Sequence, residues 1–385
     1  MGSAQAPALE LPTFKGRPGW EFTDISSLDL AAYERVGAEG AQAAGALWEL
    51  PEAAGGLPEG VIVGSLEDPG HQELVQRHLG SLVSGDDDVF VALNDAGVRA
   101  GAFVYVPRNV VVDEPISLTS VQARTGTLLN QRTLVVLEEG AQAEVWEAYL
   151  SAEGELDGVF NAVTELIVGN GARLRYVCGQ GLSERSWIFG AQRAEVGRDA
   201  RLDWVALGFG SARGRVRMET RLSGEGAEAR VTGAYATHAQ QHIDFDTTQE
   251  HAAPNTTSDL AFRGVLQGRS TAVWKGNIIV DPGAQKTDAF QESRNLLLSK
   301  RAHADAIPGL EIQANDVRCT HAAAVAQVDP EQLFYLRSRG LRPEVAKRLV
   351  IEGFLAALVE RFEQGPVRER LADALEQRLE LILGD

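Results

Sequence analysis

A pair of small residues recurs in the middle of this chain of 385 residues, each time between two short apolar runs. The first four pairs are separated by 31, 28 and 27 residues; the five pairs are Gly140-Ala141, Gly171-Ala172, Asp199-Ala200, Gly226-Ala227 and Gly283-Ala284. A loose repeat of this length without helical patterns indicates a solenoid, whose coils stack to bury one continuous core. The competing fold is a β-sandwich, whose strands alternate between turns about every 8–12 residues and lack a corner at a fixed period. The spacing therefore favours a parallel β-helix.

Short apolar or alternating runs extend this pattern over residues 89–328, which we predict to be the β-helix core. We expect strands at Val89–Leu93, Phe103–Val106 and Thr133–Leu137, because each run is short, apolar and bounded by turn residues. No long helical pattern interrupts these runs. The core is therefore predicted to be built from strands and turns alone.

Residues 1–88 are predicted to form a mixed and helical N-terminal region. The small-residue tract Gly37–Gly60 is typical of a flexible, poorly ordered linker. After it, the stretch Glu67–Leu82 has an acidic start and apolar positions at helical spacing, which predicts an amphipathic helix.

The pattern changes from the period of strands to that of helices at Asp329, so residues 329–385 are predicted to be a C-terminal helical domain. Asp329 is a suitable N-cap, Pro330 fits the first turn and Gln332 can act as the reciprocal capping residue. The helices are expected to run from Pro330 to Gly340, from Pro343 to Gln364 and onward from Pro366. Their expected apolar positions are Val345, Leu349, Phe354, Leu358 and Phe362 in the second helix and Leu371, Leu375, Leu379 and Ile382 in the third. Three capped helices at one end suggest a docking module.

Charge and cysteine content limit the classes of partner. The formal net charge of −18, without a basic block, argues against DNA or RNA, because phosphate binding relies on clustered Lys and Arg. We find neither a signal-peptide pattern nor an apolar run that approaches a membrane span, so we expect a cytoplasmic protein with no membrane partner. Cys178 and Cys319 are the only cysteines. An iron–sulfur cluster takes about four thiolates, so a partner would have to supply the missing ligands.

The stretch Asn315–Val328 places Cys319 and His321 two residues apart, directly before the predicted helices. In a strand these two side chains project from the same face, so they can serve one site. A thiolate stabilised by a neighbouring imidazolium is both a nucleophile and a metal ligand. A buried cysteine that only packs is the alternative, and the residues alone leave both interpretations open.

Two other groups of residues are weaker candidates. Cys178 shares a strand face with Leu174 and Tyr176, which favours a core position. The densest polar cluster of the strand region comprises His238, His242, Asp244, Asp246, Glu250 and His251. Its oxygen and nitrogen atoms could hold a divalent cation, but the pattern favours a solvated face or hydrogen bonds between coils.

Two long stretches resemble the SufB/SufD scaffold family. They are DFDTTQEHAAPNTTSDLAFRGVLQGRSTAVWKGNIIVDPGAQKTDAFQESRNLLLS and IPGLEIQANDVRCTHAAAVAQVDPEQLFYLRSRGL, and the resemblance covers roughly residues 89–362. The opening Gly19–Asp24 is similar to the start of SufD members. The resemblance implies a mainly β fold: a right-handed parallel β-helix between an N-terminal helical region and a C-terminal helical domain.

The resemblance also implies a function in iron–sulfur cluster assembly, in a complex with a SufB-like subunit and the ATPase SufC, which docks on the C-terminal helices. SufD-like members carry a functional Cys and His in the motif that matches Asn315–His321, so Cys319 and His321 take these roles as ligands at the subunit interface. Gly264–Thr271 and Gly283–Thr287 are not phosphate loops. The chain is therefore expected to be a scaffold without catalysis of its own, and the cluster to be transient, shared with the partner and not tightly bound by the isolated chain.

The subtype follows from two alanines. Ala302 and Ala322 stand where the SufB branch carries its essential cysteine and a glutamate, so the chain resembles the SufD partner. A homodimer of the isolated chain stays open. Two rival functions also stay open: a metal-assisted polysaccharide-processing β-helix enzyme that uses Asp244, Asp246 and Glu250, and a structural homodimer without chemistry.

Overall fold

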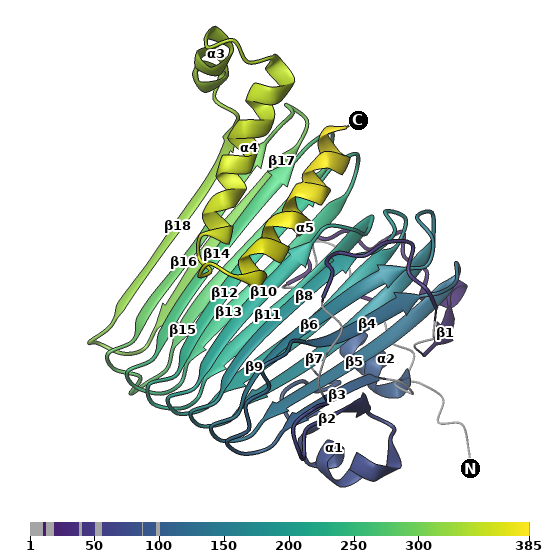
Figure 1. Ribbon diagram of the computed structural model, residues 1–385, viewed down its shortest axis with the longest axis vertical. Coiled ribbons are helices and arrows are strands. Elements are labelled where there is room, and N and C mark those ends of the chain that lie inside the picture. The colour runs from purple at the N-terminus through teal and green to yellow at the C-terminus, as the bar shows by residue number, and fades with distance from the viewer. Residues whose placement is uncertain are drawn as a thin grey trace.

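The computed structural model describes residues 11–12, 19–37, 41–50, 56–86, 88–97 and 101–384. The chain winds into a solenoid whose successive strands alternate between two sheets, here called the odd and the even sheet (Figure 1). The strands of both sheets pair in parallel, apart from β2, which pairs antiparallel with β3. The odd sheet contains β3 (Gly101–Val106), β5 (Thr127–Leu137), β7 (Gly158–Val168), β9 (Trp187–Val196), β11 (Arg213–Leu222), β13 (His242–His251), β15 (Thr271–Val280) and β17 (His303–Ile312), together with the short β1 (Glu34–Val36) and β2 (Ile62–Ser65). The even sheet contains β4 (Ile116–Gln122), β6 (Gln142–Ser151), β8 (Arg173–Gly181), β10 (Arg201–Gly208), β12 (Glu228–Thr237), β14 (Thr257–Leu266), β16 (Asp288–Leu297) and β18 (Arg318–Gln327). The prediction of a parallel β-helix is confirmed.

The recurring small pair forms the corner at which the chain passes from the odd to the even sheet. The first residue of each corner is left-handed, with φ between 54° and 73°; these residues are Asn109, Gly140, Gly171, Asp199, Gly226, Asn255 and Lys286. The second residue is almost fully buried at every one of these corners except the first, where Val110 is partly buried. Each left-handed residue donates its backbone N–H to a carbonyl of the next coil, at N···O distances of 2.6–3.3 Å. Glycine and Asn or Asp tolerate a left-handed backbone best, which explains most of these residue types.

Two corners differ from the predicted set. Gly283 is left-handed and Ala284 is buried, as expected of a corner. The bond to the next coil, however, comes from Lys286, whose N–H donates to the Asp316 carbonyl. Asn255 forms the corner before it. Neither the Asn255 nor the Lys286 corner has the small-residue pair from which the repeat was predicted.

Side chains of both sheets fill the interior of the solenoid. Tyr149 of β6 meets Phe160 of β7 at 4.8 Å between ring centroids, and Phe262 of β14 meets Trp274 of β15 at 6.4 Å. All four rings are at most 2% exposed. Alternation along each strand sends every second side chain into this core and leaves its neighbours on the outer face.

The expected strand at Val89–Leu93 is wrong, because this run is the start of helix α2 (Val89–Gly97). The Asp88 carboxylate caps the helix by accepting the Phe90 N–H at 2.7 Å. Phe90 packs on the outer face of the odd sheet, stacked on Phe189 at 3.7 Å between centroids. A five-residue apolar run fits a strand or a buried helical turn equally well, so the hydrophobic pattern could not distinguish them. The division of the chain at residues 89 and 329 stays a prediction.

The remaining N-terminal elements are short: the 3-10 helices η1 (Leu30–Ala32) and η2 (Pro69–His71) and helix α1 (Gln72–His78). The predicted amphipathic helix is thus present as η2 and α1, with Val75 buried. The expectation of a poorly ordered linker is wrong for residues 41–50, since Trp48 packs edge-on against Trp146 of β6 at 5.1 Å. The parts of the tract at 38–40 and 51–55 lie outside the described residues.

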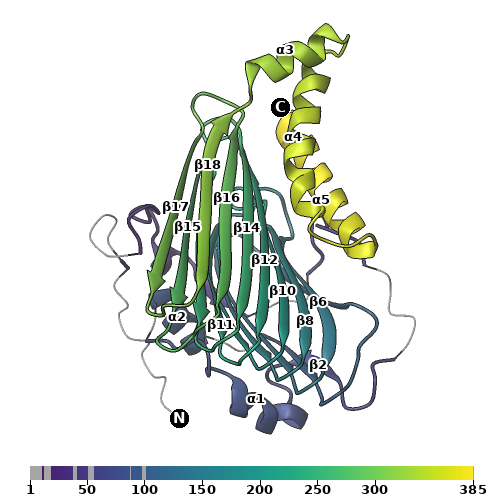
Figure 2. The same cartoon turned by 90° about the vertical axis from the view of Figure 1, so that its left-hand side faces the viewer.

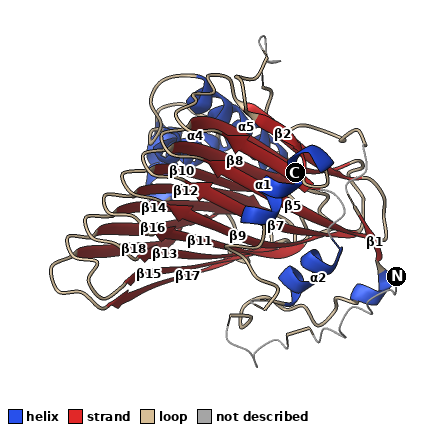
Figure 3. Ribbon diagram, turned by 90° about the horizontal axis from the view of Figure 1, so that it is seen from below, coloured by secondary structure: helices blue, strands red, loops and turns tan. Residues whose placement is uncertain are grey.

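The C-terminal helices are α3 (Pro330–Ser338), α4 (Pro343–Val359) and α5 (Pro366–Leu383), with Asp329 as the cap of α3. Figure 2 shows α4 and α5 lying on the even sheet while α3 projects beyond it. In Figure 3, α2 lies on the opposite face of the solenoid, over the odd sheet. Among the helices that the structure describes, none is long and apolar enough to cross a membrane.

The predicted apolar face of α4 is partly wrong. Ile351, Leu355, Leu358 and Val359 are buried against the even sheet, but Leu349 is 45% exposed. Leu349 instead lies near α3, where Phe334 and Tyr335 are also exposed. The third helix follows the prediction, with Leu371, Leu375, Leu379 and Ile382 all buried.

Candidate functional site

The last coil of the solenoid leaves two strands with a free edge. Within the described ranges, β17 pairs only with β15 and β18 only with β16. Their side chains are correspondingly open, and Ile312 and Val325 are each 43% exposed. Unpaired backbone N–H and C=O groups on such edges can add a further strand. This end of the molecule is therefore suited to pairing with another chain.

Cys319 and His321 both lie near the start of β18, on the same face of the strand, as predicted. The helix α3 follows the far end of β18 (Figure 1), so roughly 27 Å of strand separates Cys319 from the helices. Cys319 and His321 therefore lie at the corner between β17 and β18 and not at the junction with the helices.

Cys319 is half-buried in a small apolar group at this corner. Its register partner on β16 is Ala289, and Leu310 and Val317 pack in the same cluster. Burial raises the pKa of the Cys319 thiol above its usual value, and the nearby Asp288 carboxylate raises it further. The surroundings of Cys319 therefore favour the thiol over the thiolate in the isolated chain.

His321 is exposed, and its register partner is Gln291 of β16. The buried Gln291 amide donates to the carbonyls of Gly276 and Gly309 in the odd sheet, so this position points between the two sheets. Residues paired in register face the same way. His321 is thus directed into the open end of the solenoid, between the last two strands.

Cys319 and His321 alone are too few to hold a metal centre. The described part of the chain contains no group of three or more His, Cys, Asp or Glu side chains that could hold a metal ion. Two carboxylates near this corner are engaged in ion pairs: Asp288 of the neighbouring strand β16 with Arg318, and Asp316 with Lys286. Any centre formed on Cys319 and His321 needs ligands from elsewhere.

Ala302 and Ala322, the two alanines by which the sequence resembles SufD and not SufB, lie at different places in the last coil. Ala302 is 7% exposed and directly precedes β17, so it lies at the opposite end of the last coil from Cys319. Ala322 follows His321 and points to the opposite face of β18, in register with Glu292.

The polar cluster of β13 is divided between two faces and does not form a metal site. On the outer face, Asp244 and Asp246 both pair with Arg215, at 3.3 and 2.5 Å. Thr23 donates to Asp244 at 2.7 Å and also contacts His242 at 3.2 Å. Burial raises the pKa of Asp244 to about 6 and lowers that of His242 to about 4. This part of the cluster fastens the N-terminal segment to the odd sheet.

The other members of the cluster are held by separate partners. His251 lies in the interior, bonded to Thr256 and Ser258, and burial lowers its pKa to about 4. His238 lies before β13 and contacts Glu184 at 2.7 Å. Glu250 pairs with Arg221 at 3.1 Å. The carboxylates that a polysaccharide-processing enzyme would need are thus engaged in ion pairs, which favours the predicted structural interpretation.

Cys178 is a core residue, as favoured by its position. It is 6% exposed, and burial raises the pKa of its thiol to about 12, with a further contribution from Glu147. A thiol with such a pKa is neither a good nucleophile nor a good ligand near neutral pH.

The sequence predicts docking on the C-terminal helices but does not single out the residues: the exposed apolar side chains are Phe334 and Tyr335 of α3 and Leu349 of α4, here together called the α3–α4 patch. Phe334 is 73% exposed and Tyr335 is 56% exposed. The sequence shows that Phe334 and Tyr335 are adjacent aromatic residues, but only the structure shows that both rings are exposed.

The geometry defines a class: a solenoid of stacked strands with an open last coil, which carries a cysteine and a histidine on one face of its last strand and exposed apolar side chains on its terminal helices. Comparison with known families agrees with this class. Residues 119–354 match the family described as SUF system FeS cluster assembly, SufBD core domain, and residues 44–118 match the SufBD protein N-terminal region. The chain belongs to the SufBD family and is a SufD-like member of it.

Curated relatives cover most of the chain. The iron–sulfur cluster assembly protein SufD of Bacillus subtilis is 34% identical over 312 residues, which are 80% of this chain and 71% of the relative. A SufBD family protein of Mycobacterium tuberculosis is 32% identical over 291 residues, 74% of this chain and 72% of the relative. A SufBD family protein of Synechocystis is 27% identical over 403 residues, 96% of this chain and 88% of the relative.

Proposed function

We propose that this chain is the SufD-type scaffold subunit of a cytoplasmic complex that builds nascent iron–sulfur clusters. It would pair with a SufB-like subunit through the free edges of β17 and β18. The observation that carries the proposal is that these edges and the ligands Cys319 and His321 lie at the same open end of the solenoid. Pairing there would place the partner's ligands beside these two.

The nascent cluster is the cargo of this site, shared between two chains. His321 would supply a neutral imidazole nitrogen, and Cys319 would supply sulfur once its thiol has lost a proton. Because burial and Asp288 raise the pKa of Cys319, the isolated chain would bind iron weakly. Iron binding would favour the thiolate and release the proton. A cluster that this chain binds weakly by itself and more tightly in the complex would be transient.

A SufC-like ATPase would dock on the α3–α4 patch, and this scaffold would perform no catalysis of its own. The support for this site is that α4 and α5 already bury their other faces on the even sheet, whereas Phe334, Tyr335 and Leu349 remain open. Because α3 projects from the solenoid, a partner can reach it without unpacking the core (Figure 2). Arg378 of α5 donates hydrogen bonds to the Ala236 carbonyl and to the Gln241 side chain, and these contacts would carry motion of the helices to the strands.

Anaerobic cluster reconstitution tests the ligand assignment on the complex co-expressed with a SufB-like subunit and the ATPase. His321→Ala and Cys319→Ala are expected to lower the iron and sulfide content. Two matched controls should keep it: Thr320→Ala, on the other face of the same strand, and His303→Ala, an exposed histidine at the far end of the last coil. Unchanged iron and sulfide in both ligand variants would refute the assignment.

The docking proposal is tested by the binding of the purified ATPase subunit to the full chain. Phe334→Asp combined with Tyr335→Asp should abolish binding, since both side chains are exposed and their replacement leaves the core intact. Leu381→Asp is the control, because Leu381 is 52% exposed on α5 but lies outside the patch. Equal binding by the double variant and the wild type would contradict the proposed surface.

A further inference from the structure

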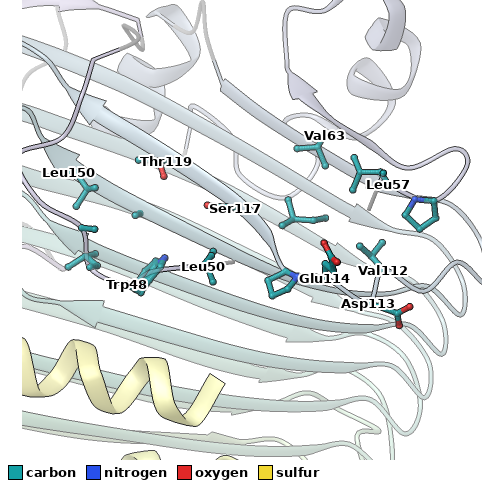
Figure 4. A pocket seen from close by; sticks show the side chains of 17 residues that line it. Trp48, Leu50, Leu57, Val63, Val112, Asp113, Glu114, Ser117, Thr119 and Leu150 are labelled. Carbon is teal, nitrogen blue, oxygen red and sulfur yellow. The ribbon is translucent and has the colours of Figure 1, made fainter. Parts of the chain in front are cut away.

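A groove of about 660 Å³ lies at the other end of the solenoid from Cys319 and His321, beside the first strand of the even sheet (Figure 4). The outer faces of β4 and β6 form one side, where Thr119 and Leu150 line it. Described residues before β2, within 46–50 and 56–58, form the other side, with Trp48 and Leu57 facing the groove. Neither Cys319, His321 nor the α3–α4 patch contributes to it.

One of the strands that line the groove, β4, has an edge that is free of partners among the described residues. In that part of the chain, β4 pairs only with β6. The Gln122 carbonyl accepts the Ala152 N–H, so the backbone of Gln122 faces β6. Alternate residues of a parallel strand bond to opposite neighbours. The backbone N–H and C=O groups of Ser117 and Thr119 therefore face away from β6, and both residues line the groove.

The walls of the groove are mainly apolar, and its charge is confined to one end. Leu50, Leu57 and Val63 contribute apolar side chains. Asp113 and Glu114 stand together at one end, and both are exposed (Figure 4). A matching ligand would offer backbone hydrogen-bonding groups along its length, apolar side chains beside them and positive charge at one end.

We propose that this groove binds an extended segment of a partner protein, which adds a strand to the free edge of β4. In such strand addition, main-chain hydrogen bonds supply affinity and pockets for alternate side chains supply specificity. The segment carries apolar residues at alternate positions, which enter the groove, and a Lys or Arg at the end that reaches Asp113 and Glu114. A small apolar molecule would leave the backbone groups of Ser117 and Thr119 unused. A second copy of this chain is a different occupant, which the experiment below separates.

Fluorescence anisotropy with the full-length chain tests the proposal directly. The probes are two labelled octapeptides in which Val and Thr alternate, one with two lysines at the N-terminus and one with two at the C-terminus. One of the two is expected to bind saturably. Thr119→Pro should weaken its binding about tenfold, because proline removes the N–H that faces the groove while the bonds to β6 remain. Thr119→Val keeps that N–H and the β-branched shape, so its affinity should match the wild type.

Peptide backbone methylation gives a second readout that does not depend on the folding of a variant. Two versions of the binding peptide are N-methylated at alternate residues, one at odd and one at even positions. Strand addition predicts that one version binds like the parent and the other loses binding. Reversal of the charges by Asp113→Lys with Glu114→Lys should weaken the lysine peptide, and the loss should shrink at high salt.

Three outcomes would overturn the proposal. One is the absence of saturable binding by both peptides. Another is equal binding of the two methylated versions, which would indicate contact with the apolar walls alone. The third is dimerisation of the chain without peptide that Thr119→Pro abolishes, which would assign the edge to a second copy.

Discussion

Arg378 adds polar contacts to the buried apolar face that attaches α5 to the solenoid, and its replacement gives a quantitative test. The guanidinium is 8% exposed and donates to the Ala236 carbonyl at 3.0 Å, the Gln241 side chain at 3.0 Å and Glu184 at 3.1 Å. Arg378→Met keeps the aliphatic stem and removes all three bonds. Glu184 retains its contact with His238, so its charge is not left alone.

The expected loss is smaller than the sum of three bonds. Hydrogen bonds to charged groups contribute about 1.5–3 kcal/mol each. Burial lowers the pKa of Arg378 in spite of the opposing attraction of Glu184, which means that desolvation offsets part of this gain. We therefore expect the local stability of α5 to fall by about 2–3 kcal/mol. Amide exchange in α5 should then become about 30- to 150-fold faster.

Hydrogen–deuterium exchange resolved by segment measures this effect, with Arg348→Met as the control. Arg348 also contacts three carboxylates, Glu352, Glu376 and Glu380, but on the exposed side of the helices. Its replacement should leave the exchange of α5 unchanged within error, because solvent screens exposed pairs. Equal acceleration by both variants, or none by Arg378→Met, would refute the assignment of Arg378 as an anchor.

Three further predictions concern the solenoid. Ala227→Leu should destabilise it by about 1–3 kcal/mol in chemical denaturation, because Ala227 is 0% exposed at a corner; a neutral effect would contradict the tight corner. His251 has a folded pKa of about 4 against 6.5 unfolded, so it contributes stability above pH 6.5 that is lost as the pH falls to about 4. In the wild type, this titration lowers the free energy of unfolding by up to about 3 kcal/mol between pH 6.5 and 4, and His251→Gln should reduce that loss. If urea titrations gave the same pH dependence of unfolding free energy for both proteins, this role of His251 would be refuted. In thiol labelling of the folded isolated chain near neutral pH, Cys178 should stay unmodified and Cys319 should react more slowly than free cysteine; mass spectrometry that found Cys178 labelled first would contradict their environments.

The sequence predicts the solenoid because its corners are local. A left-handed residue followed by a small buried one is a short pattern, and Gly140-Ala141 shows it directly. Lys286 also forms a corner, because its backbone N–H donates to the Asp316 carbonyl of the next coil and this bond favours the left-handed backbone there. That preference comes from the neighbouring coil and is not visible in the residue type.

Helical elements were harder to predict where tertiary packing decides them. The run at Val89 is helical because Asp88 caps it and Phe90 finds Phe189 on the odd sheet, a contact between segments about 100 residues apart in sequence. The exposed face of α4 likewise depends on how α4 and α5 share the even sheet. Leu349 is apolar but lies outside that contact, which no helical periodicity reveals.

The candidate site was predictable in its residues but not in its surroundings. The period of a strand places Cys319 and His321 on one face, and the structure agrees. The free edges of β17 and β18 follow from the sheet order, and the raised pKa of Cys319 follows from burial beside Leu310 and from Asp288. These facts depend on register between coils.

Hydrogen–deuterium exchange of β17 and β18, with and without the SufB-like subunit, tests most directly whether the last coil is the interface with that subunit. In the isolated chain, the amides on the free edges should exchange fast. In the complex, these same amides should be protected at least about tenfold, while the β10 and β12 amides stay unchanged. A complex that forms without added protection of β17 and β18 would contradict the account.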